Sequence, residues 1–218
     1  MLEPFPQSAP ADPEKLARFA DAAPLVGVDE AGRGCLAGPV VAAAVYFPPD
    51  CDAHALFPGL NDSKKLSAEK RETLYPLIRA HTVWSLGLSW PREIDEANIL
   101  NATFRAMARA VSTLRLAPLP RLFIDGNHPI RAAAWRHVTS LPQPAQFPVI
   151  KGDGLIPAIS AASVLAKVYR DLLMARLDRR YPRYGFAVHK GYGTKAHCEA
   201  LAASGMCPLH RRSFKSGV

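Results

Sequence analysis

The apolar residues of this chain fall into five short runs, each bounded by polar or turn-forming residues. Runs of this length between turn residues are typical of buried strands. The first two runs are joined through a tight Gly-Arg-Gly turn, and two prolines end the second. The pattern therefore predicts strands within residues 24–30, 39–47, 82–90, 121–127 and 145–153.

Helical patterns lie between and after these strands. Ser67 is a suitable N-cap for one helix, and Pro91 is a suitable first residue for a longer one. The order of elements favours an α/β fold in which helices cover a mixed sheet and basic C-terminal helices form an attached layer. The expected helices cover residues 68–81, 91–114 and 155–181, with a loop at 48–62 and a loop and short helix near the C-terminus.

The composition is that of a globular protein of 218 residues, with 49% hydrophobic and 21% charged side chains. No run of about 18 apolar residues is present, so a membrane span is not expected. The N-terminus lacks the basic-then-apolar pattern of a secretory signal, and residues 1–13 hold four prolines, which favours a loose tail. Four cysteines without metal-ligand spacing favour reduced thiols and a cytoplasmic protein.

The net charge of +8 is concentrated in the last third of the chain. Residues 1–150 carry 15 basic and 15 acidic side chains, whereas residues 151–218 carry 12 basic and four acidic ones. Such asymmetry favours a polyanionic partner, nucleic acid above all. A merely solvated basic helix face is the alternative.

Four acidic residues stand at or just beyond the ends of predicted strands: Asp29, Glu30, Asp125 and Asp153. Ligands of open α/β sheets bind outside the carboxyl ends of the strands. Converging carboxylates repel one another unless a cation lies among them, and their oxygens suit Mg²⁺ or Mn²⁺ better than zinc. Solvated turn carboxylates are the alternative. Neighbouring strand residues face opposite ways, so Asp29 and Glu30 share a site only if the strand ends or bends there.

The segment GRGCLA formally matches a dinucleotide-binding turn, but its surroundings do not fit that function. A helix should follow such a turn, whereas Pro39 and a strand-like run follow this one. The two acids before the turn would also repel a pyrophosphate. The glycines are better explained by close approach of bare backbone to a ligand held at the neighbouring acids.

Five segments occur in an order that resembles the bacterial type 2 ribonuclease H family, ribonuclease HII: GVDEAGRGCLAGPV, NDSKKLS, FIDGN, KGDGLIPAISAASVLAKVYRD and YGFAVHKGYGTKAH. The resemblance implies a ribonuclease H-like fold with a mixed five-stranded sheet. It also implies hydrolysis of RNA in RNA/DNA hybrids and incision at single ribonucleotides in duplex DNA. The expected organisation is a proline-rich tail at 1–23, a catalytic domain at 24–181, and a basic C-terminal loop and helix at 182–218 that complete the substrate site.

The resemblance also implies roles for particular residues. The family's four metal-binding acids correspond to Asp29, Glu30, Asp125 and Asp153, which would hold Mn²⁺ or Mg²⁺. Its sugar-sensing turn corresponds to Gly32, Arg33 and Gly34. Its junction-sensing tyrosine corresponds to Tyr192, whose ring would stack on the deoxyribose that follows the ribonucleotide. The 2′-hydroxyl is the natural handle for telling RNA from DNA.

Other residues are weaker candidates. Asp171 is a rival for the fourth acid, but an ion pair or an exposed helix face suits it better. His189 and His197, which flank Tyr192, are expected at the surface, and the three tryptophans are expected in the core or in packing contacts. Six residues are candidates for contacts with the phosphates of a nucleic-acid backbone: Asn61, Ser63, Lys64, Lys65, Ser163 and Lys167. Capped turns, and side chains that extend from apolar faces, are the alternatives.

The function expected from the sequence is that of a monomeric, metal-dependent endonuclease without an obligate protein partner. Water would attack the phosphate 5′ to the ribonucleotide, leaving a 3′-hydroxyl and a 5′-phosphate. A non-catalytic hybrid-binding protein is one alternative, and it predicts the loss of at least one acid. A different two-metal nuclease is another, and it would need no sugar-sensing turn.

Overall fold

The structure is a computed structural model that describes residues 24–214 of the chain. At its centre lies a five-stranded sheet with the order β3-β2-β1-β4-β5. Strands β1, β2 and β3 pair antiparallel, whereas β1, β4 and β5 run parallel, so their carboxyl ends lie side by side. All five predicted strands are confirmed: β1 (Leu25–Ala31), β2 (Val40–Tyr46), β3 (Val83–Ser89), β4 (Arg121–Asp125) and β5 (Gln146–Val149).

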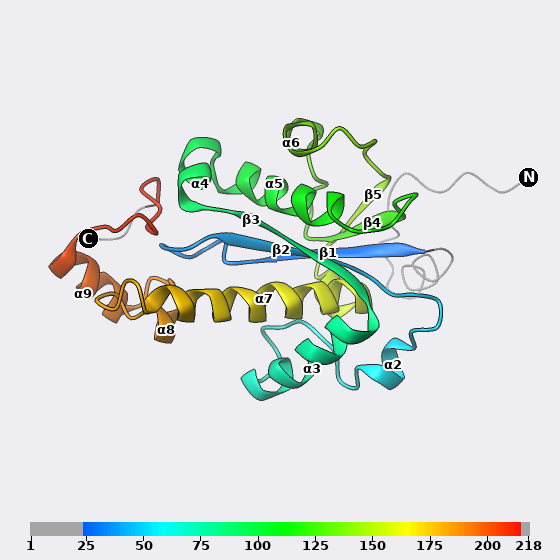
Figure 1. Ribbon diagram of the computed structural model, residues 1–218, viewed down its shortest axis with the longest axis horizontal. Coiled ribbons are helices and arrows are strands. Elements are labelled where there is room, and N and C mark those ends of the chain that lie inside the picture. Colours follow the sequence, from blue (N-terminus) through cyan, green and yellow to red (C-terminus); the bar gives the residue numbers. More distant parts are fainter. Residues whose placement is uncertain (1–23, 215–218) are drawn as a thin grey trace, which may run out of the picture.

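Helices cover both faces of the sheet (Figure 1). One face carries α4 (Pro91–Ala97), α5 (Ile99–Ser112) and α6 (Ala132–Val138). The other face carries α2 (Ala53–Leu56), α3 (Ala68–His81) and α7 (Pro157–Asp178). Two short helices, α8 (Phe186–His189) and α9 (Lys195–Ser204), lie at the C-terminal end of α7. The predicted α/β architecture, a mixed sheet flanked by helices with a C-terminal helical extension, is thus confirmed.

Alternate residues of β1 face the two helical layers. Val26 and Val28 belong to the core formed with α5, whereas Ala31 packs into the core formed with α7. On the α7 side, Gly27 allows a very close approach, because a Cβ added there would lie 2.2 Å from the carbonyl carbon of Ala158. Helix α7 therefore lies directly on β1, within reach of the side chains that point to this face, including Asp29.

The single helix predicted over residues 91–114 is wrong, because Asn98 divides it into α4 and α5. Asn98 has a φ of 65°, in the left-handed region that asparagine tolerates better than most residues. Its side chain also accepts a hydrogen bond from the backbone N–H of Asn101 at 3.0 Å and so caps α5. The predicted loop at 48–62 contains the short α2, and α6 has no counterpart among the predicted helices.

The C-terminal segment packs on the end of α7 rather than standing apart from it. Tyr184, Phe186 and Leu201 form a buried cluster with Met174 of α7 and with Ala37, which follows β1. This contact brings the loop before α9 next to the loop that leaves β1.

Two parts of the chain, residues 1–23 and 215–218, lie outside the described residues, and the predicted N-terminal tail falls there. Within residues 24–214, no helix is both long and apolar enough to cross a membrane.

The three tryptophans occupy different environments. Trp135 is buried in the core, and Trp84 packs beneath the guanidinium of Arg79, which lies 5.1 Å from its ring, so both predictions are confirmed. Trp90 is 42% exposed, so a core position is wrong for it. It stands at the N-cap of α4, where the chain turns from β3 into the helix at the end of the sheet.

Candidate active site

Three of the predicted acids meet at the carboxyl ends of the parallel strands. Asp29 lies near the end of β1, Asp125 is the last residue of β4, and Asp153 lies in the 3₁₀ turn η1 (Gly152–Gly154) that follows β5. One carboxylate oxygen from each lies within 4.8 Å of the others. We call these three residues the acid cluster. Its position agrees with the rule that ligands bind outside the carboxyl ends of neighbouring strands.

The acid cluster is electrostatically unfavourable without a counter-charge. Burial raises the pKa of Asp29 well above its usual range, and Glu30 and Asp125 raise it further. Burial, together with Asp125 and Asp62, raises the pKa of Asp153 to about 6. A divalent cation would relieve this repulsion, and a donor set made only of carboxylate oxygens suits Mg²⁺ or Mn²⁺. The residues present therefore fit the metal that the sequence predicts.

Glu30 stands beside the acid cluster rather than within it. Strand β1 does not end at Glu30 but continues in regular register, with Glu30 opposite Ala42. The interruption of the strand that would let Glu30 share the site with Asp29 is therefore not seen in the pairing. Arg33 pairs with Glu30 at 3.3 Å; burial raises the pKa of Glu30 overall, and Arg33 offsets part of that rise. A metal-binding role for Glu30 stays a prediction.

Two buried serines lie behind Asp29. The Oγ atoms of Ser63 and Ser163 are 2.8 Å apart, and each residue is about 3% exposed. Ser163 also hydrogen-bonds the carboxylate of Asp29, which lowers the pKa of that group. This geometry favours a role for both serines in orienting Asp29 over the contact with a phosphate that the sequence suggests.

The other predicted phosphate contacts lie nearer the surface. Asn61, Lys64 and Lys65 are exposed on the loop before α3. Burial acts to lower the pKa of Lys64, but attraction to Asp29 and other carboxylates raises it overall. Lys167 pairs with Asp171 at 2.9 Å, so the predicted ion pair of Asp171 is confirmed.

Asp62 is an acid of the site that the sequence analysis missed. Its side chain hydrogen-bonds Asp153, and one of its oxygens accepts the backbone N–H of Lys64 at 2.9 Å. It therefore connects the acid cluster with the loop before α3. The sequence feature that could have indicated Asp62 is its position in the segment NDSKKLS, between the predicted phosphate contacts Asn61 and Ser63.

A cleft of about 620 Å³ begins beside the acid cluster and runs along the glycine turn, which we define as Gly32, Arg33 and Gly34. Gly32 has a φ of +95°, and a Cβ there would lie 2.0 Å from Nε of Arg170. Gly34 is exposed, and a Cβ there would meet nothing within 4 Å. The residues that line the cleft include Glu30, Arg33, Gly34, Lys64, Lys167 and Tyr192.

Tyr192 also lines the cleft. Its side chain is 41% exposed, and Nζ of Lys167 lies 5.6 Å from the centre of its ring. Arg170 lies at 5.9 Å from the same ring, and the hydroxyl hydrogen-bonds Cys35. The structure thus brings the glycine turn and Tyr192, more than 150 residues apart in sequence, to one cleft.

Two buried arginines hold the backbone of the glycine turn and of the segments next to it. Arg211 donates to the backbone oxygens of Gly32 and Arg33, both at 2.7 Å, and to that of Gly38. Arg170 donates to the carbonyls of residues 37, 39 and 190. Both are about 1% exposed. The sequence includes both among the basic residues of the last third of the chain, but neither is at the surface. Their guanidinium groups bind backbone carbonyls, since a guanidinium offers five donors in a fixed fork.

The surface position predicted for His189 and His197 is wrong. His189 is 8% exposed and His197 is fully buried, and their rings stack at 4.3 Å beneath the loop that carries Tyr192. Their hydrogen-bond partners lie nearby, among residues 184–210, but only the fold of the loops before and after α9 brings these groups together and buries them.

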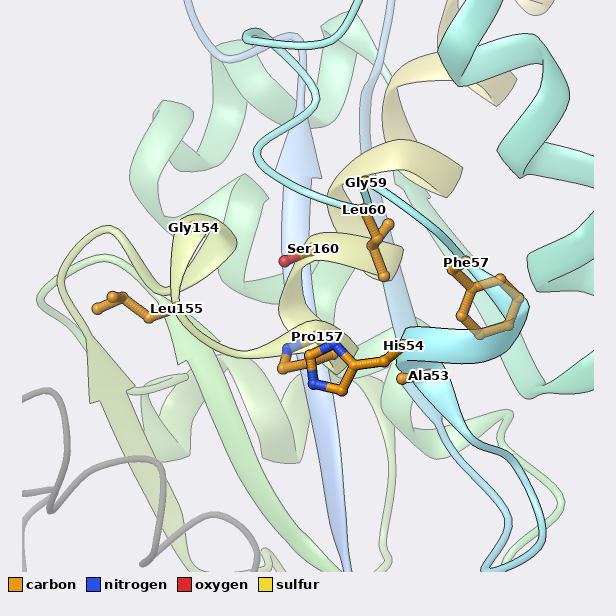
Figure 2. Close-up of a pocket in the computed structure, with 9 residues that line it drawn as sticks. All are labelled: Ala53, His54, Phe57, Gly59, Leu60, Gly154, Leu155, Pro157 and Ser160. Carbon is orange, nitrogen blue, oxygen red and sulfur yellow. The ribbon is translucent and has the colours of Figure 1, made fainter.

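A second, smaller pocket of about 200 Å³ lies on the other side of η1, between α2 and the first turn of α7 (Figure 2). Ser160 lies at this pocket and donates a hydrogen bond to the carbonyl oxygen of Asp153 at 2.7 Å. None of the described residues that line it is acidic. Ser160 therefore helps to hold the loop that carries Asp153.

Comparisons with known proteins agree with this geometry. A family model described as Ribonuclease HII matches residues 26–217. A Ribonuclease HII of Nitratidesulfovibrio vulgaris is 56% identical over 213 residues, covering 94% of this chain and 93% of the relative.

Solved structures resemble it as well. The ribonuclease H2 of Pyrococcus horikoshii OT3 superposes with a TM-score of 0.73 at 26% identity and covers 89% of this chain and 95% of its own. The ribonuclease HII of Archaeoglobus fulgidus, solved in a complex with PCNA, gives a TM-score of 0.68 at 27% identity, with 88% and 96% coverage.

Proposed function

The chain belongs to the ribonuclease HII family of metal-dependent endonucleases that hydrolyse RNA in RNA/DNA hybrids, and we propose that it also incises duplex DNA 5′ of a single embedded ribonucleotide. The observation that carries the proposal is one cleft that holds the glycine turn and Tyr192 and begins beside the acid cluster. The acid cluster can then act on the phosphate of the same nucleotide whose sugar the glycine turn contacts.

The acids provide the chemical part of the proposal. Asp29, Asp125 and Asp153 would hold divalent ions, with Glu30 completing the set from the adjoining position. Ions held there would supply the Lewis acid that activates water and stabilises the leaving oxygen. Ser163 supports the reaction by fixing the orientation of the Asp29 carboxylate. The products would be a 3′-hydroxyl on the upstream strand and a 5′-phosphate on the ribonucleotide.

In this proposal the glycine turn distinguishes a ribonucleotide from a deoxyribonucleotide. At Gly34 the backbone is open to the cleft, with no side chain to hold a ligand away. A 2′-hydroxyl both donates and accepts, so exposed backbone N–H and C=O groups can bind it and leave a deoxyribose unrecognised. Tyr192 would stack on the following deoxyribose, where a second 2′-hydroxyl would be excluded.

The surroundings of the cleft suit a nucleic-acid strand. Lys64 and Lys167 both line it, next to the exposed Asn61 and Lys65. Cations at these positions would contact phosphates, which positions a duplex without reading its sequence. We also propose that the enzyme acts as a monomer in the cytoplasm, in line with the free thiols of Cys35, Cys51 and Cys207.

The proposal is tested with three labelled duplexes of one sequence: one with a single ribonucleotide, its all-DNA twin, and a continuous RNA/DNA hybrid. We expect Mg²⁺- or Mn²⁺-dependent cutting of the first and third, and a single incision 5′ of the ribonucleotide in the first. Extension of the upstream product by a DNA polymerase checks its 3′-hydroxyl.

Two other functions make different forecasts in the same assay. A general two-metal nuclease would cut the all-DNA twin as well as the first duplex. A non-catalytic hybrid-binding protein would cut none of them, but all of the predicted acids are present. Either result would contradict the proposed function.

Replacing Gly34 by alanine tests the approach of backbone to the sugar. The free protein has space for the added methyl group, so the melting temperature should not change. If the ribose sits against this backbone, the methyl group displaces it by about 1 Å, and incision should fall by about 10²-fold. Single-turnover incision and thermal melting measure the two effects.

Arg33→Ala is the matched control for Gly34→Ala. The Arg33 side chain points to Glu30 and is half exposed, so its loss should reduce incision less than Gly34→Ala does. Gly32→Ala is unsuitable as a test, because it would clash with Arg170 in the free protein. Incision by Gly34→Ala at the wild-type rate would remove backbone contact from the proposal.

A further inference from the structure

Beneath Tyr192 lies a group of three histidines that the proposed chemistry does not use. His197 and His210 are joined through their Nε2 atoms at 3.1 Å, and the ring of His189 stacks on that of His197. Phe186 packs against all three rings, with centre-to-centre distances of 5.6 to 5.9 Å. We call His189, His197 and His210 the histidine chain.

The hydrogen bonds determine where each proton lies. The backbone N–H of Cys207 donates to Nδ1 of His210 at 2.9 Å, so the His210 proton is on Nε2. That proton is donated to Nε2 of His197, which leaves the proton of His197 on Nδ1. Nδ1 of His197 in turn donates to the carbonyl oxygen of Tyr192 at 2.9 Å.

His189 is also held as a single tautomer. Its Nδ1 accepts the backbone N–H of Gly191 at 3.2 Å, and its Nε2 donates to the carbonyl oxygen of Tyr184 at 2.6 Å. Each of the three rings therefore uses one nitrogen as donor and one as acceptor, which is possible only for an uncharged imidazole. In agreement with this, burial, with His197 as the next cause, lowers the pKa of His210 to about 4, and burial also lowers the pKa of His197.

The loop that these rings hold has an unfavourable backbone. Lys190 has a φ of 52°, in the left-handed region that a lysine rarely adopts, and Gly191 follows with a φ of 83°. Tyr192 comes next, and its N–H donates to the carbonyl oxygen of His189 at 2.9 Å. Such a turn persists only where neighbouring groups fix it: the His197 ring fixes the carbonyl of Tyr192, and the main chain of residue 189 fixes its N–H.

The same loop is joined to the segment that follows the glycine turn. The carbonyl oxygen of Gly191 accepts the backbone N–H groups of Leu36 and Ala37 at 2.9 and 3.3 Å. The histidine chain therefore acts on the distance between the Tyr192 ring and the glycine turn. These are the two parts of the cleft that would enclose the sugars on either side of the junction.

We propose that the histidine chain positions Tyr192, so that His197 and His210 are specificity-determining positioning residues for single-ribonucleotide substrates. The inference rests on the proposed function of Tyr192 and deepens it. His197 touches neither substrate nor metal, and it acts through the carbonyl of Tyr192. Its loss should change the choice between substrates more than the rate of hydrolysis itself.

The test is the ratio of kcat/KM on the single-ribonucleotide duplex to kcat/KM on the continuous hybrid. His197→Phe keeps the ring and the packing but removes both hydrogen bonds. We expect it to lower the ratio by about threefold to tenfold, the effect of one hydrogen bond. His197→Asn can keep the donor to Tyr192 and should restore much of the ratio. His137→Phe, on the exposed face of α6, is the matched control and should leave the ratio unchanged.

Tyr192→Ala separates the two ideas. If it leaves the ratio unchanged, the proposed role of Tyr192 is wrong. If it lowers the ratio while His197→Phe does not, or if His197→Phe slows both substrates equally, the positioning role is overturned. Adding His197→Phe to Tyr192→Ala should lower the ratio no further, because both act on the same contact. Should His197→Phe fail to fold, the ratios of His197→Asn and the equivalent His210→Gln decide the matter.

Discussion

Asp29→Asn should reduce incision by about 10³-fold or more, because it removes the most buried carboxylate of the acid cluster and with it several kcal/mol of transition-state stabilisation. Asp29 lies on β1, and its carboxylate is hydrogen-bonded by Ser163. The neighbouring charges of Glu30 and Asp125 raise its pKa. Asparagine has the same shape and can still accept the backbone N–H of Glu30. The change therefore removes a charge without emptying the space.

The same variant should be more stable than the wild-type protein in a chelator. The raised pKa of Asp29 means that its charged form is disfavoured in the fold, so at neutral pH the carboxylate lowers the free energy of unfolding. Asparagine carries no such cost, and each kcal/mol regained should add about 2–4 °C to the melting temperature. With Mg²⁺ or Mn²⁺ added, the wild-type protein should gain more stability than the variant.

Asp171→Asn is the matched control for this experiment. Asp171 was the rival for the fourth acid, but it pairs with Lys167 on α7. Its neutralisation should leave most of the incision activity in place. A loss as deep as that of Asp29→Asn would move Asp171 into the catalytic set. A fall of several degrees in the melting temperature of Asp29→Asn would instead show that its inactivity is a folding defect.

The sequence was sufficient for the parts of the site that local pattern determines. Each strand is an apolar run with turn residues at its ends, and Asp125 and Asp153 follow such runs directly. Because β1, β4 and β5 are parallel neighbours, the acids at their carboxyl ends had to meet. The position of Glu30 depended on whether β1 ends or bends there, and the strand keeps its regular pairing through Glu30 and Ala31.

The parts that escaped prediction depend on contacts that the folded chain makes and that no periodic pattern announces. Arg211 looks like a surface charge until the carbonyls of the glycine turn are placed against it, and Arg170 until those of Ala37 and Pro39 are. His197 looks like a surface histidine until His210 is placed against it. Asn98 divides one apolar stripe into two helices, because a cap and a left-handed residue outweigh the periodicity of the stripe.

Arg211→Met should lower the free energy of unfolding by about 3 kcal/mol, or about 6–12 °C in melting temperature. Methionine fills similar space, but it leaves the carbonyl oxygens of Gly32, Arg33 and Gly38 without their donor. Each buried acceptor left unsatisfied costs about 1–3 kcal/mol. Part of this loss is offset, because burial and the neighbouring Arg170 lower the pKa of Arg211 to about 10, which shows that the charge itself is disfavoured there.

The activity of Arg211→Met should fall at temperatures where the protein is still folded. The guanidinium fixes the carbonyls of two successive residues of the glycine turn from one side, while the other side faces the cleft. Without it the turn can shift, and a displacement of about 1 Å at a substrate contact can cost about 10²-fold in rate. Arg211→Lys should recover little of this loss, since an ammonium cannot bond to all three carbonyls in the fork geometry that arginine provides.

Arg212→Met is the matched control, because Arg212 is the next residue and its side chain is exposed. Its backbone N–H bonds to Asp95, and the substitution leaves that contact intact. Melting temperature and incision of the single-ribonucleotide duplex should both stay near their wild-type values. If Arg211→Met melts and cuts like Arg212→Met, the turn is held by its own backbone, and the sugar-sensing geometry does not depend on the C-terminal segment.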